Sequence, residues 1–180
     1  DGEDATHFNI GVPFPVGSVI KYRYSRLGDI PWDEHTSDGR QVRYRIVYVD
    51  SPGTIEDSVA RWTDSSYSGE TGRIHGVITD SASSLPVANI LVACGGFQTL
   101  SASDGSFVIE GLTPGIHNLV AYSLDGSYQP FQQGAQIAEQ ATTPAPISLE
   151  KAQQVNVRFI VSLPSETPPA VPVRIAGNLY

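Results

Sequence analysis

One cysteine, two lysines and no methionine occur among the 180 residues of this chain. A single cysteine, Cys94, excludes an internal disulfide framework. Its apolar neighbours indicate a buried core residue, and a disulfide to another chain is the alternative. No apolar run approaches the roughly 20 residues that a membrane-spanning helix needs. Because position 1 is not methionine, we expect a processed product or an internal segment of a longer protein.

Positive charge is also scarce, since 11 Lys and Arg residues face 19 Asp and Glu residues and the net charge is −8. This acidity argues against nucleic acid and anionic membrane as partners. The 17 glycines and 13 prolines indicate many turns. The one stretch with helical character is short and covers residues 132–140. We therefore expect an all-β protein of two modest domains rather than one.

The patterns of catalytic and metal sites are missing. The histidines His7, His35, His75 and His117 are scattered, without the spacing of a metal site. The acidic clusters lack calcium-loop spacing, and we find no nucleophile elbow, phosphate loop or recognisable pair of catalytic carboxylates. We predict no catalytic residues, no bound metal and no cofactor, and the chain is not expected to be an enzyme.

The first piece, residues 1–63, shows strand periodicity. A strand is expected near residues 7–12 and a last one over residues 54–62. Between them, Ile20 and Tyr22 share one face of a strand, and Tyr44 and Ile46 share one face of another. Asp38 and Gly39 provide the intervening turn. The opposite face carries Arg23, Arg43 and Arg45, which we interpret as a solvated basic stripe, with a binding site as the less favoured alternative.

A polar linker, residues 64–72, separates this piece from a second one, residues 73–150. There, short alternating strands are divided by turns at residues 80–84, 104–105, 114–115 and 125–126. Strands of this length and spacing are typical of an antiparallel β-sandwich. The middle piece should therefore fold by itself, with Cys94 buried inside it.

Residues 101–122, SASDGSFVIEGLTPGIHNLVAY, carry a specific resemblance together with the strand and turn pattern before them. The middle piece resembles the carboxypeptidase regulatory-like domain, a transthyretin-like seven-stranded sandwich, over about 75 residues. The resemblance implies a non-catalytic spacer or accessory of a secreted protein.

The last piece, residues 151–180, alternates apolar and polar residues over 155–161 and again over 171–177. The segment VNVRFIVSLPSETPPAVPVRIAGNLY is similar to the opening strands of starch-binding and glycogen-binding modules. PFPVGSVIKYRYSR, PWDEH and VARW, in the first piece, resemble the later strands of the same module. The resemblance implies one sandwich split between the two chain ends, beside a complete one in the middle. Immunoglobulin-like and transthyretin-like sandwiches in tandem are thus the expected architecture.

By the same resemblance, Trp32 stands where the module has a sugar-stacking tryptophan and Arg23 where it has a sugar-contacting lysine. Two parts of the family pattern are missing: a second ligand-contacting tryptophan before residue 180, and the Asn-Arg pair after the stacking tryptophan, where Gln41, Val42 and Arg43 stand. A tryptophan that only covers the edge of the sandwich is the alternative.

A half-sandwich leaves strand edges and an apolar face uncovered, so it needs its missing half. We predict an interface in which Val155, Val157, Phe159 and Ile175 of one copy meet Ile20, Tyr22, Tyr44 and Ile46 of the next. The favoured function is a repeat unit of an extracellular or cell-surface fibre, with further copies of itself as partners. The alternative is a carbohydrate-binding accessory region of a secreted glycoside hydrolase or surface protein, with α-glucan or another polysaccharide as partner. Closure of the tail onto the head of the same chain is also open.

Overall fold

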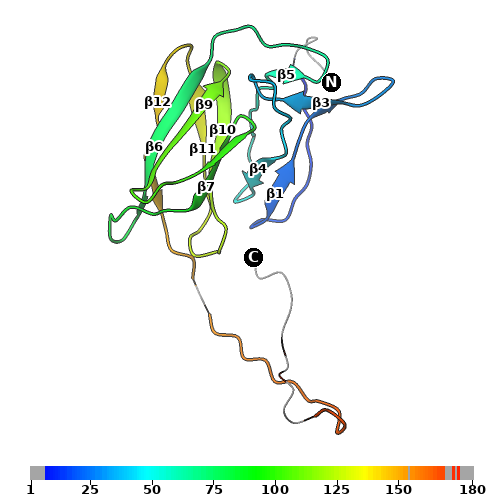
Figure 1. Cartoon of the computed structure of the whole chain (residues 1–180), viewed down its shortest axis with the longest axis vertical. Coiled ribbons are helices and arrows are strands. Elements are labelled where there is room, and N and C mark those ends of the chain that lie inside the picture. The colour runs from blue at the N-terminus through cyan, green and yellow to red at the C-terminus, as the bar shows by residue number, and fades with distance from the viewer. Residues whose placement is uncertain (1–6, 154, 169–171, 173, 175–180) are drawn as a thin grey trace.

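The computed structural model describes residues 7–153, 155–168, 172 and 174, and every regular element in them is a β-strand. The all-β prediction is therefore confirmed. None of these residues belongs to a helix long and apolar enough to cross a bilayer. Below, the head denotes residues 1–63, the middle sandwich denotes strands β6 to β13, and the tail denotes residues 151–180. Figure 1 shows the head and the middle sandwich side by side, with the tail leaving the sandwich at its lower end.

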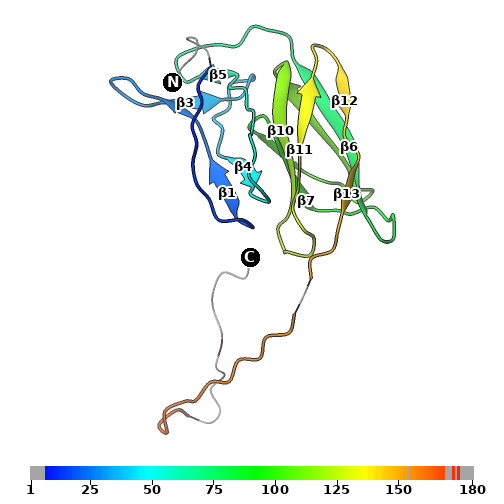
Figure 2. The same ribbon diagram turned by 180° about the vertical axis from the view of Figure 1, so that it is seen from behind.

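The middle sandwich consists of two sheets between Gly72 and Leu149. The first has the order β11-β10-β7-β8, and in the second β6 lies between β9 on one side and β12 and β13 on the other (Figure 2). The strands of the first sheet are β7 (Ile90–Cys94), β8 (Phe97–Leu100), β10 (Gly115–Ser123) and β11 (Phe131–Ile137). Those of the second are β6 (Gly72–Asp80), β9 (Ser106–Leu112), β12 (Thr142–Pro144) and β13 (Ile147–Leu149).

Turn chemistry fixes the connections of this sandwich. Gly105 has a φ of 76°, a conformation that favours glycine, and its N–H donates to Ala102 in the turn before β9. The turn expected at residues 104–105 is therefore present. Residues 132–140, in contrast, were expected to have helical character, and β11 occupies most of them. Cross-strand pairing with β10 along all seven β11 residues outweighs the helix preference of this Gln- and Ala-containing stretch.

The core lies between the two sheets and contains residues such as Ile74, Ile78, Leu119 and Ile147, each at most 1% exposed. All five residues of β7 are buried, although alternate side chains of a strand point to opposite faces. Ile90, Val92 and Cys94 belong to the core between the sheets. Leu91 and Ala93 point outward and are covered by the head. Cys94 is buried, as predicted from its apolar neighbours.

The head contains two small sheets. In one, β1 (Val19–Tyr22) pairs antiparallel with β4 (Arg45–Tyr48). In the other, β3 (Trp32–His35) lies between β2 (Ser25–Arg26) and β5 (Arg61–Trp62). The strand expected over residues 54–62 is reduced to β5, because the side chain of Arg45 binds this part of the chain at Asp57 and Ser58. Residues 8–12 form no strand either.

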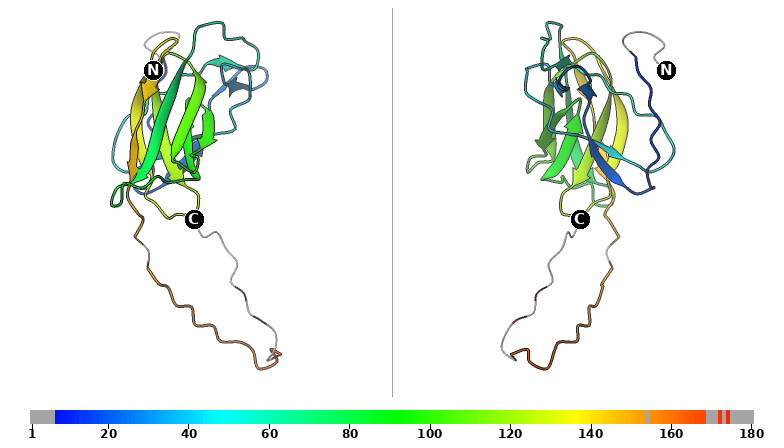
Figure 3. Two further views of the ribbon diagram at one scale, coloured as in Figure 1. Left: turned by 60° about the vertical axis from the view of Figure 1, so that its left-hand side comes forward. Right: turned by 90° about the vertical axis from the view of Figure 1, so that its right-hand side faces the viewer.

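The head docks on the outer face of the first sheet. Ile46, which is 3% exposed, packs with Leu91, Ala93 and Val120, and Val19, Tyr44 and Tyr122 contact this cluster. Figure 3 shows the head against one face of the sandwich from two sides. Burial of apolar surface on both sides of β7 explains why its sequence is a continuous apolar run rather than an alternating one.

The tail runs away from both units. Residues 155–163 have no regular structure and are exposed, and the views in Figures 1 and 3 agree that this part extends beyond the sandwich. The second strand expected in the tail, residues 171–177, lies largely outside the described residues.

Candidate functional site

The two residues predicted for sugar binding, Trp32 and Arg23, lie on opposite faces of β3. Trp32 and Asp33 are neighbours in this strand, so their side chains point to opposite faces. Arg23 forms an ion pair with Asp33, at 3.6 Å between Nη1 and Oδ2, and therefore lies on the Asp33 side. Trp32 is half-buried. The structure thus does not bring Arg23 and Trp32 together on one stacking platform.

A buried ion cluster holds the head together. Arg45 donates through Nη2 and Nε to Glu34 Oε2, at 2.8 and 3.0 Å, and through Nη1 to Asp57 Oδ1, at 2.9 Å. The side chains of these three residues are exposed by 5%, 0% and 3%. Arg45 Nη2 also donates to the carbonyl oxygen of Ser58. Sequence analysis assigned Arg45 to a solvated basic stripe, and this was wrong because two carboxylates compensate its charge inside the head.

Two tyrosines complete this cluster. The hydroxyls of Tyr22 and Tyr24 donate to Asp57 Oδ2, at 2.5 and 3.1 Å, and the rings contact each other edge to face. Burial and the neighbouring Asp57 carboxylate raise the pKa of Tyr24 to about 12 and raise that of Tyr22 further. Both hydroxyls therefore remain protonated donors at neutral pH. A satisfied buried network of this kind positions chain segments, and its hydrogen-bonding groups are already used.

A small cavity lies beside the buried ion cluster of the head. A cavity of about 10 Å³ lies between the head and the middle sandwich, bordered by Tyr44, Arg45 and Cys94 among others. This volume admits about one water molecule. Burial raises the pKa of the Cys94 thiol to about 12, so the nucleophilic thiolate is suppressed at neutral pH. This small cavity thus admits little more than a water molecule, while a more open hollow of about 290 Å³ lies between Arg40 of the head and strands β8 and β9.

The four head residues predicted for assembly do not share one face. In the β1–β4 pair, Ile20 is opposite Val47 and Tyr22 is opposite Arg45, whereas Lys21 is opposite Ile46. Residues opposite each other in an antiparallel pair point to the same face. Ile20 and Tyr22 are therefore on one face, and Ile46 is on the other, packed with Tyr44 against the middle sandwich. The expectation of a single apolar face was wrong, because the sandwich of the same chain takes the Ile46 side.

Side chains of the middle sandwich also cover one edge of this sheet. Gln98 donates to the carbonyl of Tyr44 at 2.8 Å, and Asn118 donates to that of Ile46 at 3.1 Å. The N–H of Tyr48 donates to the side-chain oxygen of Gln132 at 2.9 Å. These amide groups satisfy backbone groups of β4 and of Tyr44 just before it, which an incoming strand would need. The edge of β1 that faces away from β4 has no strand beside it in the described part of the chain.

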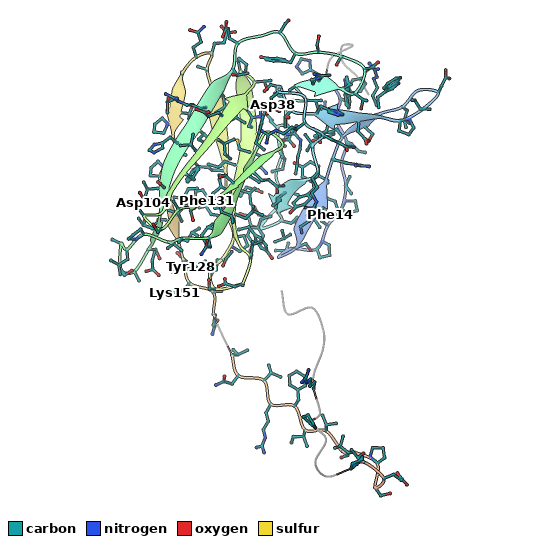
Figure 4. The ribbon with its side chains drawn as sticks, viewed as in Figure 1. Phe14, Asp38, Asp104, Tyr128, Phe131 and Lys151 are labelled. Atoms are coloured by element: carbon teal, nitrogen blue, oxygen red, sulfur yellow. The ribbon has the colours of Figure 1, made fainter. Side chains whose placement is uncertain are left out.

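The tail residues predicted for assembly are uncovered. Val155, Val157 and Phe159 are each at least 66% exposed, and they alternate with polar Asn156 and Arg158. Ile175, the fourth predicted tail residue, lies outside the described residues. Figure 4 shows this part of the tail and its side chains lying apart from the two folded units.

A second uncovered segment, residues 8–16, overlaps the strand that the sequence predicted near residues 7–12. Its even-numbered residues are all apolar and all exposed: Phe8, Ile10, Val12, Phe14 and Val16. Its period-2 apolar spacing is typical of a half-buried strand, but the sequence analysis assigned this segment no role in assembly. Figure 4 places Phe14 beside the small sheets of the head.

Among the described residues no group of three or more His, Cys, Asp and Glu side chains could hold a metal ion. The second lysine, Lys151, lies 3.6 Å from Asp80, where the tail leaves the sandwich (Figure 4). Asp80 also accepts hydrogen bonds from Tyr128 and from Ser83. The N–H of Ala152 donates to the carbonyl of Ser127 and holds the base of the tail at the sandwich.

No family model and no curated protein matches this chain. Solved structures do match. GBS52, the minor pilin of Streptococcus agalactiae, is 17% identical over 72% of this chain and 63% of its own, with a TM-score of 0.41. The Bacillus anthracis TIE protein is 8% identical over 74% of this chain and 24% of its own, with a TM-score of 0.40.

The group B streptococcus pilus 2b backbone protein is 12% identical over 73% of this chain and 53% of its own, with a TM-score of 0.38. The chain thus spans less than two thirds of the length of each of these three proteins.

Proposed function

We propose that this chain is a non-catalytic structural subunit of an extracellular or cell-surface filament, in which the tail of one copy docks on the head of the next. The observation that carries this proposal is the uncovered tail. Residues Val155, Val157, Phe159, Val161 and Leu163 are exposed at every second position. An alternating apolar stripe of this kind suits a strand that is half-buried by a partner.

The head supports the same proposal. It consists of strands of two to four residues, and one of its sheets has only two strands. An isolated two-stranded sheet is marginal in water and requires further packing. The middle sandwich covers one face of it, and on the other face Ile20 is only half-buried.

We also infer that the middle sandwich is a carboxypeptidase regulatory-like domain and that head and tail are the two parts of a starch-binding-type module. Two four-stranded sheets and the turn at Gly105 support the first inference. The second is consistent with the short strands of the head. In this proposal the middle sandwich is the spacer between successive junctions.

The carbohydrate-binding accessory role is the second candidate, and the position of Trp32 on the other face from Arg23 disfavours it. Titration of the chain with a soluble α-glucan tests this role. A dissociation constant in the micromolar range or below that is lost in Trp32→Ala would overturn the filament proposal.

Light scattering and sedimentation of the full chain test the proposal directly. The Val157→Asp/Phe159→Asp variant should remain monomeric, because it places two charges on the apolar stripe, while the unaltered chain forms polymers whose length grows with concentration. Asn156→Asp/Ser162→Asp adds the same charge to the same segment on its polar side, and should polymerise. A strictly monomeric unaltered chain at all concentrations would overturn the proposal.

A further inference from the structure

Two uncovered segments of equal length lie at opposite ends of this chain. The N-terminal segment, residues 8–16, and the tail segment, residues 155–163, each hold five exposed apolar residues at two-residue spacing. In an extended chain such residues share one face. Each segment therefore presents one apolar face that its own chain leaves exposed.

The backbone of the two segments is uncovered as well. Between residues 8 and 14, and between 155 and 163, the described structure contains no backbone–backbone hydrogen bond. Only the Pro15 carbonyl accepts one, from Ser18, in the turn that leads to β1. Figure 2 shows the N-terminal segment as a separate extended trace beside β1. Both segments thus have the properties of strands that lack a partner.

Pro13 and Pro15 make the two hydrogen-bonding edges of the N-terminal segment unequal. In an extended strand the N–H and C=O of one residue face one edge, and those of the next residue face the other edge. Both prolines are odd-numbered, so the odd edge lacks two donors. The even edge, formed by residues 8, 10, 12, 14 and 16, keeps every donor and acceptor. A partner strand is thus admitted at one edge only, and the prolines protect the other from further pairing.

We propose that the tail segment of a second copy pairs with the even edge of the N-terminal segment and forms the joint between successive subunits. This inference rests on the proposed filament function and names the strand that receives the tail. The edge of β4 is excluded as the receiving strand because Gln98, Asn118 and Gln132 already occupy it. In the paired state the five apolar side chains of each segment lie on adjacent strands.

Crosslinking tests this pairing without assuming a strand direction. Val12 is the central residue of its segment and Phe159 is the central residue of the tail segment, so they face each other in parallel and in antiparallel pairing. Two chains, Val12→Cys and Phe159→Cys, are mixed and oxidised. Directly opposed strand residues meet the Cα separation that a disulfide requires. The native Cys94 is buried, and the unaltered chain treated alike gives the background.

The matched control is Leu27→Cys mixed with Phe159→Cys, because Leu27 is a more exposed head residue, outside the N-terminal segment. Val12→Cys should give at least about ten-fold more mixed dimer than Leu27→Cys, because pairing raises the local concentration of the two thiols. Equal yields from Val12→Cys and Leu27→Cys, in a chain that still polymerises, would overturn this joint and leave the filament proposal standing.

One chain carrying both Val12→Cys and Phe159→Cys separates the remaining outcomes. A ladder of disulfide-linked multimers supports the joint between copies. A crosslinked monomer, with no mixed dimer from the single-cysteine chains, shows that the tail closes on its own head. That result would overturn both this inference and the filament proposal.

Discussion

The middle sandwich and the head are stabilised in different ways. Strands of up to nine residues and a continuous apolar core between two sheets stabilise the middle sandwich. The head has strands of at most four residues, and among its described residues Arg45, Glu34 and Asp57 form a buried cluster of charged groups. Its Ile46 is buried by packing on the sandwich. We therefore expect the middle sandwich to be stable by itself, whereas the head depends on ion pairs and on packing against the sandwich.

The chain carries natural reporters for this difference. Both tryptophans, Trp32 and Trp62, are in the head, so tryptophan fluorescence follows the head alone. Cys94 is buried in the core of the sandwich, so thiol labelling follows the opening of that unit. Comparison of the two signals shows which unit a substitution affects.

Gly76→Val should have the largest effect and should unfold the middle sandwich. A Cβ atom at residue 76 would lie 1.9 Å from the carbonyl oxygen of Ala145 and 2.6 Å from the ring of Phe107. The backbone at Ala145 cannot move far enough to relieve so short a contact. We therefore expect the free energy of unfolding to fall by more than about 5 kcal/mol. Rapid labelling of Cys94 at neutral pH would report it.

Gly53→Val is the matched control, because a Cβ atom there meets nothing within 4 Å. It should leave labelling of Cys94 as slow as in the unaltered chain. Slow labelling of Gly76→Val as well would contradict the packing of β6 against the segment before β13.

Arg45→Met should destabilise the head by about 3 to 5 kcal/mol, because it leaves the buried carboxylates of Glu34 and Asp57 without their cation. The urea midpoint followed by tryptophan fluorescence should fall. Cys94 should remain protected from labelling at urea concentrations where the head has already unfolded. The variant thus separates the two transitions and sharpens the distinction between the units.

Arg40→Met removes an exposed partner of Asp38 and serves as its control. Exposed pairs contribute about 0 to 1 kcal/mol, so its fluorescence midpoint should barely change. If Arg45→Met and Arg40→Met behaved alike, the ion cluster would not be what holds the head together.

Acid should weaken the middle sandwich through Asp80. Hydrogen bonds from the backbone and hydroxyl of Ser83 hold the pKa of Asp80 at about 2, below its ordinary value. The unfolded chain therefore binds more protons between about pH 4 and pH 2. Stability from Asp80 is present above this window and is lost as the pH falls through it. In Asp80→Asn the urea midpoint, followed by far-ultraviolet circular dichroism, should fall less between pH 5 and pH 2.5.

The exposed Asp29 of the head provides the control, since Asp29→Asn should keep the acid sensitivity of the unaltered chain. Asp104 and Asp125 also have a lowered pKa, because each accepts hydrogen bonds from nearby serines, so Asp80→Asn should reduce the sensitivity without abolishing it. Equal acid sensitivity of Asp80→Asn and the unaltered chain would show that the turn around Asp80 does not supply it.

The parts of the fold that could be predicted from the sequence are those that local residue preferences determine. The turn at residues 104–105 and the buried run at residues 90–94 follow from residue types whose preferences agree with the tertiary structure. Residues 132–140 were misassigned because pairing with β10 overrides their local preference. The apolar run of β7 also indicates a strand that is covered on both faces. Docking of the head on the sandwich is therefore reflected in the local sequence of β7.

The candidate sites were harder to predict, because they depend on register and on long-range charge pairs. Alternation places Arg45 on a polar face, and only the spatial approach of Glu34 and Asp57 makes that face a buried one. Likewise, Ile20 and Ile46 look alike in the sequence, and the β1–β4 register assigns them to opposite faces. The alternation of apolar residues such as Val155 and Phe159 in the tail was visible in the sequence, because it depends on neighbouring residues alone and not on contacts with distant parts of the chain.

The parallel pairing of the first and last strands of the sandwich has a mechanical consequence. The chain enters through β6 and leaves after β13, and these strands lie parallel, with Ile78 beside Ile147 and Asp80 beside Leu149. Tension applied at the two ends would pull parallel strands in opposite directions along their length. The hydrogen bonds between them would then be loaded together in shear instead of opening one after another. A sandwich connected in this way resists stretching.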